Sequence, residues 1–180
     1  MGCDEKMVLQ AVKEVKPVEG RMELIKAKQN FSVIIDYCQH INNYEQIFEF
    51  VDSVRQNKGR LIAVLGAPGK RNYKMRREIG KVANKYLDHV ILTQLDDRGE
   101  NVYDICKTIQ AEIVDISSVI IPSRQVAIEQ AIEIACKDDI ILILGKGHEK
   151  FISLEVGHVD YPGDSTIVKE AIGRIYGEND

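Results

Sequence analysis

The fold is decided by residues 140–149, which read IILILGKGHE. Five consecutive apolar residues, Ile140–Leu144, predict a strand buried on both faces, because a strand with one face in water would alternate apolar and polar residues. Two glycines follow and share a short loop with Lys146, His148 and Glu149. Glycine lets the backbone approach a ligand closely. The loop is therefore either a ligand-binding loop or a turn with solvated charges, and spacing alone does not separate the two.

Four more short apolar runs occur along the chain, at Ser32–Asp36, Leu61–Leu65, His89–Thr93 and Val119–Ile121. Between and after them lie stretches with apolar residues at helical spacing, and Val54 and Ile175 belong to two of these apolar faces. Buried strands that alternate with helices predict an α/β fold. We expect a Rossmann-like, doubly wound, mostly parallel sheet of about five or six strands with helices on both faces.

The two ends of the chain depart from this alternation. Residues Asp4–Val15 predict a helix, and Lys16–Gly20 a linker, so we expect residues 1–20 to be the remnant of a preceding central domain and residues 21–180 to form the α/β domain. The runs 21–27 and 31–36 flank a polar turn and predict a β-hairpin. A second hairpin is expected from 151–154 and 158–161, around a glycine.

Composition places the chain among ordinary globular proteins. It has 180 residues, 44% hydrophobic and 29% charged, with a formal net charge of −4. This charge argues against a nucleic-acid partner. No apolar run approaches the ~20 residues that span a bilayer, so we expect no membrane partner and a cytoplasmic location. The four cysteines form no CxxC pair, and we expect neither a structural disulfide nor a metal site.

Doubly wound folds bind ligands at the carboxyl ends of their strands. The loops after Asp36, Leu65, Thr93 and Leu144 should therefore lie together on one edge of the sheet. Residues 66–77 (GAPGKRNYKMRR) combine two glycines with five cations, which suits an anion such as phosphate or carboxylate. The sequence contains neither a P-loop pattern nor GxGxxG. A solvated, basic helix start is the alternative for this loop.

Two other loops are weaker on their own. Residues 93–100 (TQLDDRGE) have the composition of an ordinary turn, in which an aspartate caps the next helix. Residues 36–40 (DYCQH) place a carboxylate at a strand end. There Asp36 is either a ligand group or a helix cap.

Taken in order, these loops resemble the Mur ligase family, specifically the C-terminal domain of its tripeptide-synthetase type. Residues 20–23 (GRME) are similar to the family's GRxE, residues 36–40 to its DYAH, and residues 66–80 to its GxGGDRDxxKRxxMG loop. Residues 145–149 match its GKGHE without change, and 161–171 are similar to its FxDxxxxxEA ending. Five motifs in this order cover nearly the whole chain.

The resemblance implies an ATP-dependent, acyl-phosphate ligase that adds an amino acid to a UDP-N-acetylmuramoyl peptide, with ATP and Mg²⁺ as cofactors. Arg21 and Asp36 would contact ATP. The incoming amino acid would be held by Arg71, Leu95, Asp96, Asp97, Arg98, Gly145 and Glu149. Arg76, Lys146 and His148 would support these loops. An arginine suits the substrate carboxylate, and Glu149 suits its ammonium group.

The chain also departs from the family pattern. Gln39 stands where the family has histidine, Lys70 where it has aspartate, and residues 95–98 (LDDR) replace its DNPR. These changes bear on which amino acid is added. Arg98 favours diaminopimelate and the neighbouring aspartates favour lysine; of the two we expect diaminopimelate.

In the family, the P-loop and a modified, magnesium-holding lysine belong to a central domain, which has no counterpart in this sequence. We therefore expect no catalytic residue within this domain and no activity from the chain alone. Two rival interpretations remain. One is a free-standing nucleotide- or nucleotide-sugar-binding Rossmann domain. The other is a non-enzymatic interaction module, which predicts that Arg71 and Glu149 face away from any cleft.

Overall fold

The computed structural model describes residues 18–26, 28–55 and 58–177, together with the single positions 4, 7 and 14. The helix expected over Asp4–Val15 lies almost entirely outside the described residues, as does most of the linker that follows it. Within the described ranges, no helix is long and apolar enough to cross a membrane.

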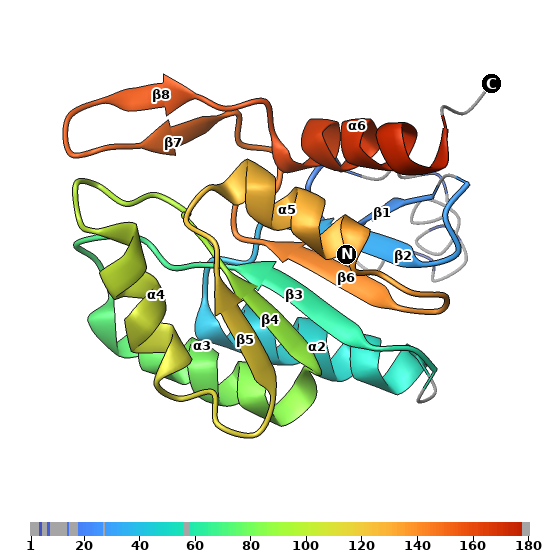
Figure 1. The fold of residues 1–180 in the computed structure, drawn as a ribbon, viewed down its shortest axis with the longest axis horizontal. Coiled ribbons are helices and arrows are strands. Elements are labelled where there is room, and N and C mark those ends of the chain that lie inside the picture. Colours follow the sequence, from blue (N-terminus) through green and yellow to red (C-terminus); the bar gives the residue numbers. More distant parts are fainter. Residues whose placement is uncertain are drawn as a thin grey trace.

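A six-stranded sheet forms the centre of the molecule, with the strand order β1-β2-β6-β3-β4-β5 (Figure 1). Strand β1 pairs with β2 in antiparallel orientation, and the other neighbours pair in parallel. The predicted α/β, mostly parallel fold is thus confirmed. The strands are β1 (Glu23–Ile25), β2 (Ser32–Asp36), β3 (Leu61–Leu65), β4 (His89–Leu92), β5 (Ser117–Ile120) and β6 (Ile140–Leu144).

Five helices cover the two faces of the sheet in the described part of the chain (Figure 1). Helices α2 (Ile41–Arg55), α3 (Tyr73–Tyr86) and α4 (Val102–Gln110) enclose one hydrophobic core, and α5 (Arg124–Glu133) and α6 (Asp164–Tyr176) enclose the other. Successive residues of β3 and β6 point into opposite cores, so every position of β3 is buried. This arrangement explains why these strands read as unbroken apolar runs.

Three apolar residues assigned to buried patterns are exposed. Val119 lies on β5, which has a neighbour on one side only, and it is partly open to solvent. Val54 and Ile175 lie in the final turns of α2 and α6 and are about half exposed. Helix periodicity identifies the apolar face but does not show where the covering layer ends.

Both predicted hairpins are present. The first is the β1–β2 pair, and the second forms a separate sheet of β7 (Phe151–Ser153) and β8 (His158–Asp160). In Figure 1 this second hairpin lies beyond the carboxyl ends of the parallel strands. The Ser153 carbonyl accepts a hydrogen bond from the Arg98 amide at 3.1 Å, and Lys70 and Glu155 form an ion pair at 2.6 Å. The hairpin is therefore attached to the loops that carry the candidate site.

Candidate functional site

The four loops singled out in the sequence meet at one edge of the sheet, as predicted. The Gly69 amide donates to the Asp96 carbonyl at 2.7 Å, which joins the loops after β3 and β4. The Gln39 side-chain amide donates to the Gly145 carbonyl at 2.8 Å, which joins the loops after β2 and β6. Parallel strands bring all of their carboxyl ends to the same edge, so these contacts follow from the topology.

A cavity of about 160 Å³ lies between the loops after β2, β3 and β4. Four predicted site residues line it, namely Arg71, Leu95, Asp96 and Arg98, together with Gln39, His40, Pro68, Asn72 and Met75. The interaction-module interpretation placed Arg71 away from any cleft, and this expectation is wrong. Arg71 is exposed and makes no hydrogen bond or ion pair with another described residue. Its five donors remain available to an anion in the cavity.

Lys146 is the central cation of this edge, and its side chain is fully buried. Its ammonium nitrogen lies 3.0 Å from Asp96 Oδ1 and 2.5 Å from Glu149 Oε2. The same nitrogen lies 4.7 Å from the centre of the Phe151 ring. A buried ammonium group has to be paired. Lys146 therefore pairs with two carboxylates at once and joins the loops after β4 and β6.

Glu149 receives a second donor from the loop after β2. The Tyr37 hydroxyl donates to Glu149 Oε1 at 3.0 Å. Burial, and then the Glu149 carboxylate, raise the pKa of Tyr37, so the hydroxyl keeps its proton. The Arg21 guanidinium stacks 4.4 Å from the centre of the Tyr37 ring, and the exposed His148 ring lies 5.4 Å from it. Arg21, predicted to contact ATP, thus lies beside the predicted amino-acid loop.

Gly147 permits this close approach. Its φ is +52°, and a Cβ there would lie 2.7 Å from the Gly20 carbonyl oxygen and 2.9 Å from Tyr37 Cα. A side chain at this position would push these segments away from the loop. The GRME segment and the DYCQH loop therefore pack against residues 145–149 through the backbone.

The two aspartates beside Arg98 both accept hydrogen bonds from other groups of the protein. Asp97 accepts from the Gln94 side-chain amide at 2.6 Å and from the Gly99 amide at 2.8 Å, so its carboxylate caps its own turn. Besides Lys146, Asp96 accepts from the Ser153 amide at 2.9 Å. The Arg98 guanidinium lies 3.5 Å from Asp96 Oδ2 and also donates to the Asp96 carbonyl oxygen at 3.4 Å, and Arg98 lines the cavity.

Arg76 is buried and turned away from solvent. Its guanidinium donates to both oxygens of Glu100, at 2.6 and 2.7 Å, and to the Pro68 carbonyl at 3.0 Å. The hydrogen bonds from Arg76 hold the pKa of Glu100 at about 2. Arg76 thus ties the loop after β3 to the start of α4, and its support of the binding loops stays a prediction.

Asp36 lines a second hollow, of about 310 Å³. Its carboxylate accepts from the Cys38 amide at 2.8 Å and from the Met22 amide at 2.9 Å. The hollow is otherwise lined by Met22, Asn43, Gln46, Ile47 and Phe50. Neither amide belongs to a helix, since α2 begins at Ile41, so the helix-cap alternative for Asp36 is wrong. Asp36 orders the local backbone and borders a hollow, and its role as a ligand group stays a prediction.

Comparison with known proteins identifies the family. The family model described as Mur ligase, glutamate ligase domain, matches residues 20–147. The chain belongs to the Mur ligase family. A UDP-N-acetylmuramyl-tripeptide synthetase of Treponema denticola is 36% identical over 177 residues, which cover 96% of this chain and 33% of the relative. A UDP-N-acetylmuramoyl-L-alanyl-D-glutamate–2,6-diaminopimelate ligase of Aquifex aeolicus is 37% identical over 174 residues, covering 96% and 35%.

A solved structure shares the fold of this Mur ligase chain. It is a UDP-N-acetylmuramoyl-L-alanyl-D-glutamate–2,6-diaminopimelate ligase, with a TM-score of 0.75, 24% identity, and coverage of 96% of this chain and 35% of that one. The chain thus spans about a third of the length of the relatives it matches. The resemblance to the tripeptide-synthetase type is confirmed.

Two residues that make contacts between the loops of this Mur ligase chain were not predicted from the sequence. Tyr37 lies in the DYCQH segment but was given no role, and Gln39 was noted only as a departure from the family pattern. Both lie in the loop that follows a buried strand, where ligand-binding groups are common in this fold class. Their position directly after the strand is the feature of the sequence that could have identified them. Their partners, Glu149 and Gly145, are distant in sequence and could not be identified in this way.

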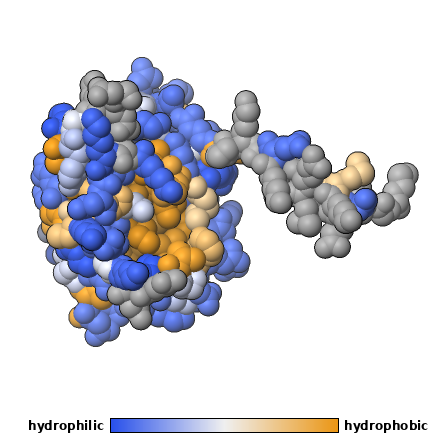
Figure 2. Space-filling model, turned by 90° about the vertical axis from the view of Figure 1, so that its right-hand side faces the viewer, coloured by the Kyte–Doolittle hydropathy of each residue, from blue (hydrophilic) through white to orange (hydrophobic). Residues whose placement is uncertain are grey.

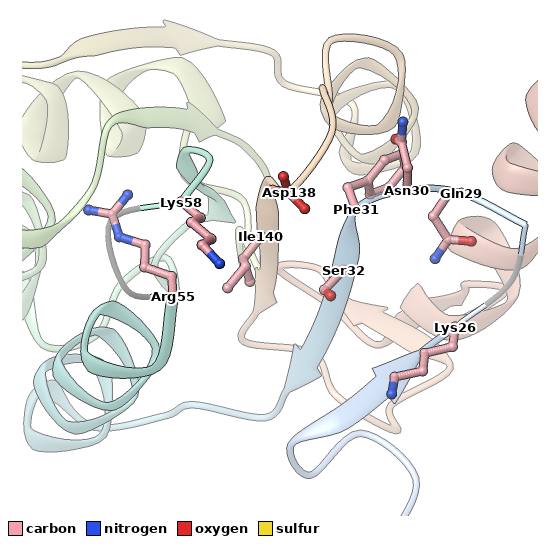
Figure 3. Close-up of a pocket in the computed structure, with 9 residues that line it drawn as sticks. All are labelled: Lys26, Gln29, Asn30, Phe31, Ser32, Arg55, Lys58, Asp138 and Ile140. Atoms are coloured by element: carbon pink, nitrogen blue, oxygen red, sulfur yellow. The ribbon is translucent and has the colours of Figure 1, made fainter.

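A larger hollow of about 480 Å³ lies at the opposite edge, where the strands begin (Figure 3). It contains none of the predicted site residues and is lined by Lys26, Gln29, Asn30, Phe31, Ser32, Arg55, Lys58, Asp138 and Ile140. Arg55, one of its cations, is engaged by Asp52 at 2.8 Å and by Asp88 at 2.5 Å. Figure 2 looks toward this side of the molecule and shows hydrophobic residues between hydrophilic ones.

Proposed function

We propose that this chain is the C-terminal domain of an ATP-dependent ligase that adds an amino acid to a UDP-N-acetylmuramoyl dipeptide. ATP phosphorylates the terminal carboxylate of the dipeptide, and the amine of the incoming amino acid displaces phosphate to form the new amide bond. The observation that supports this role is the cavity bordered by Arg71 and Arg98 beside the Glu149 loop. In our proposal, residues 21–180 form this domain, and residues 1–20 are a terminal helix and linker that remain from a preceding central domain.

The nucleotide would meet this domain at the hollow beside Asp36. Its carboxylate has the chemistry to accept a hydrogen bond from a ribose hydroxyl, and the exposed ring of Phe50 borders the same hollow. Arg21 immediately precedes Met22, which also lines this hollow. The printed sequence contains no P-loop, so the phosphates and Mg²⁺ would be held mainly by the central domain.

The amino acid would bind in the cavity between the loops. Arg71 is free to pair with the α-carboxylate, and Glu149 accepts hydrogen bonds at the neighbouring loop, where an ammonium group would share it with Lys146. Arg98 would pair with a carboxylate at the far end of the side chain. Asp96 and Asp97, which would favour lysine, are engaged by Lys146, Gln94 and backbone amides. We therefore propose diaminopimelate as the amino acid.

This proposal is tested by titrating the isotope-labelled chain with diaminopimelate and with lysine and recording amide shifts by NMR. We expect diaminopimelate to bind about tenfold more tightly, since one charge-assisted pair contributes roughly 1.5–3 kcal/mol. Arg98→Ala should remove this preference, whereas Arg71→Ala should weaken both ligands alike.

The matched control is Arg77→Ala, which changes an exposed arginine of α3 whose partner, at 3.6 Å, is Glu112. It should leave both affinities unchanged. Tighter binding of lysine, with no effect of Arg98→Ala, would contradict the diaminopimelate assignment. Absence of binding of any amino acid, with shifts on adding ATP alone, would favour a nucleotide-binding domain instead.

A further inference from the structure

A fully buried arginine lies directly behind the loops that border the amino-acid cavity. The side chain of Arg124 is 1% exposed. Its Nη2 donates to the carbonyl oxygen of Leu144 at 3.0 Å, and its Nη1 to that of Gln94 at 3.4 Å. Leu144 immediately precedes Gly145, and Gln94 immediately precedes Leu95. One guanidinium therefore joins the backbones of both loops at the point where each begins.

Asp164 and Tyr161 fix the orientation of this guanidinium. Asp164 is fully buried and accepts from Arg124 Nε and Nη2, each at 2.8 Å. The Tyr161 hydroxyl donates to Asp164 Oδ1 at 2.7 Å. Burial by itself lowers the pKa of Arg124, but the charge of Asp164 outweighs it, so the guanidinium stays protonated. A planar group held on one side by two hydrogen bonds presents its remaining donors in a fixed direction.

The location of Arg124 is unfavourable for a residue that serves stability alone. It is the first residue of α5, where the helix dipole disfavours a cation. A buried ion pair also loses hydration, and well-packed apolar residues of similar volume are often at least as stabilising. What an apolar pair does not provide is hydrogen-bond donors aimed at two carbonyl groups on neighbouring loops.

The two loops touch each other closely where Arg124 holds them. A Cβ on Gly145 would lie 2.7 Å from Leu95 Cδ1, and Lys146 reaches Asp96 at 3.0 Å. A small change in their spacing would therefore alter both the packing of Leu95 and the pairing of Lys146.

We propose that Arg124 is a positioning residue that sets the spacing between the 95–98 and 145–149 loops and so controls the affinity for the amino acid. The effect on affinity rests on the proposed function, whereas the effect on loop order does not. Arg124 touches no substrate in this scheme and acts through the two loop backbones.

Two variants separate positioning from stability. Arg124→Lys keeps the charge but cannot reach Asp164 and both carbonyls at once. The triple variant Arg124→Met, Asp164→Leu, Tyr161→Phe replaces the buried polar group by apolar side chains. The control is Arg60→Met at the opposite edge of the sheet, where Arg60 Nη2 likewise bonds a carboxylate, Asp139, at 2.7 Å and a carbonyl, Ile134, at 2.6 Å.

Three quantities are measured for each protein: the midpoint of thermal unfolding, the affinity for diaminopimelate, and the hydrogen-exchange rates of the Gly145 and Gly69 amides. The Gly145 amide donates to the backbone carbonyl oxygen of Asp36 at 3.0 Å, and the Gly69 amide donates to that of Asp96 at 2.7 Å. We expect both Arg124 variants to lose about tenfold or more in affinity, as for one charge-assisted hydrogen bond. The two amides should exchange about tenfold faster even where the unfolding midpoint is unchanged. Arg60→Met should lower the midpoint and leave affinity and the two amides unchanged.

Wild-type affinity and exchange rates in the folded triple variant would overturn the proposal. If the wild-type chain binds no amino acid, the proposed function fails, and the exchange rates of the Gly145 and Gly69 amides still decide whether Arg124 orders the loops.

Discussion

Arg71 and Arg76 belong to the same basic stretch, residues 66–77, and the structure gives them different environments. Arg76 follows Met75 on the buried side of α3, so its guanidinium is enclosed and bonded to Glu100 and Pro68. Arg71 precedes the helix and stays exposed at the cavity. Which cation of a basic loop is buried depends on the rotation of the following helix. The sequence therefore identifies the loop as basic but does not assign the individual arginines.

The Arg76–Glu100 pair makes stability depend on pH in a defined window. The folded-state pKa of Glu100 is about 2, below its ordinary value of 4.5. Its contribution is therefore fully present above about pH 4.5 and is lost as the pH falls through about 2. After allowance for solvent screening, we expect on the order of 1–2 kcal/mol. Glu100→Gln should lower the unfolding free energy at pH 7, and the difference from wild type should vanish near pH 2.

Urea denaturation of both proteins across this pH range measures the effect. Glu155→Gln, which removes the exposed partner of Lys70, is the control and should change the profile little. A constant difference between wild type and Glu100→Gln at every pH would contradict the assignment of this acid sensitivity to Glu100.

At the scale of elements, local patterns predicted most of the architecture. Strands β2, β3 and β6 begin and end where their apolar runs do, because strands buried on both faces leave an unbroken signal. Strand β5 starts two serines earlier than expected, since an edge strand needs no apolar residue there. The individual side-chain contacts between elements could not be predicted from the sequence. Arg124 with Asp164 and Tyr37 with Glu149 pair residues far apart in sequence, and no local period encodes such pairs.

Gly69 holds the loop after β3 against the loop after β4, and it is the most crowded glycine of the site. A Cβ there would lie 1.7 Å from the Asp97 carbonyl oxygen. Because the obstacle is backbone, Gly69→Ala has to displace one of the two loops. We expect it to cost about 3 kcal/mol of unfolding free energy and to weaken diaminopimelate binding.

Gly157→Ala is the matched control for this prediction. Gly157 has a φ of +74° but no atom within 4 Å of an added Cβ, so the substitution should cost only about 1 kcal/mol of backbone strain. It should leave ligand affinity unchanged. Chemical denaturation and the NMR titration check both variants, and equal effects of the two substitutions would contradict the importance of the Gly69 contact.

At the scale of the whole molecule, one edge of the sheet carries both the cavity that we propose for the amino acid and the hollow beside Asp36. The edge supplies arginines for carboxylates and a carboxylate for a hydroxyl or an ammonium group. Phosphoryl transfer also needs a dense set of backbone donors and a metal ion around the transferred group.

The sequence contains no P-loop pattern, and on that ground we propose that this chain binds the amino acid and yet releases no phosphate by itself. The reaction mixture contains the chain, ATP, Mg²⁺, a UDP-N-acetylmuramoyl dipeptide and diaminopimelate, and free phosphate is measured over time. The full-length relative of Aquifex aeolicus, whose name states diaminopimelate as its amino acid, serves as the positive control. Sustained phosphate release by the chain alone, abolished by Arg71→Ala, would show that these loops grip the nucleotide phosphates themselves. In that case Arg71 and its neighbours would have to be reassigned from the amino acid to ATP.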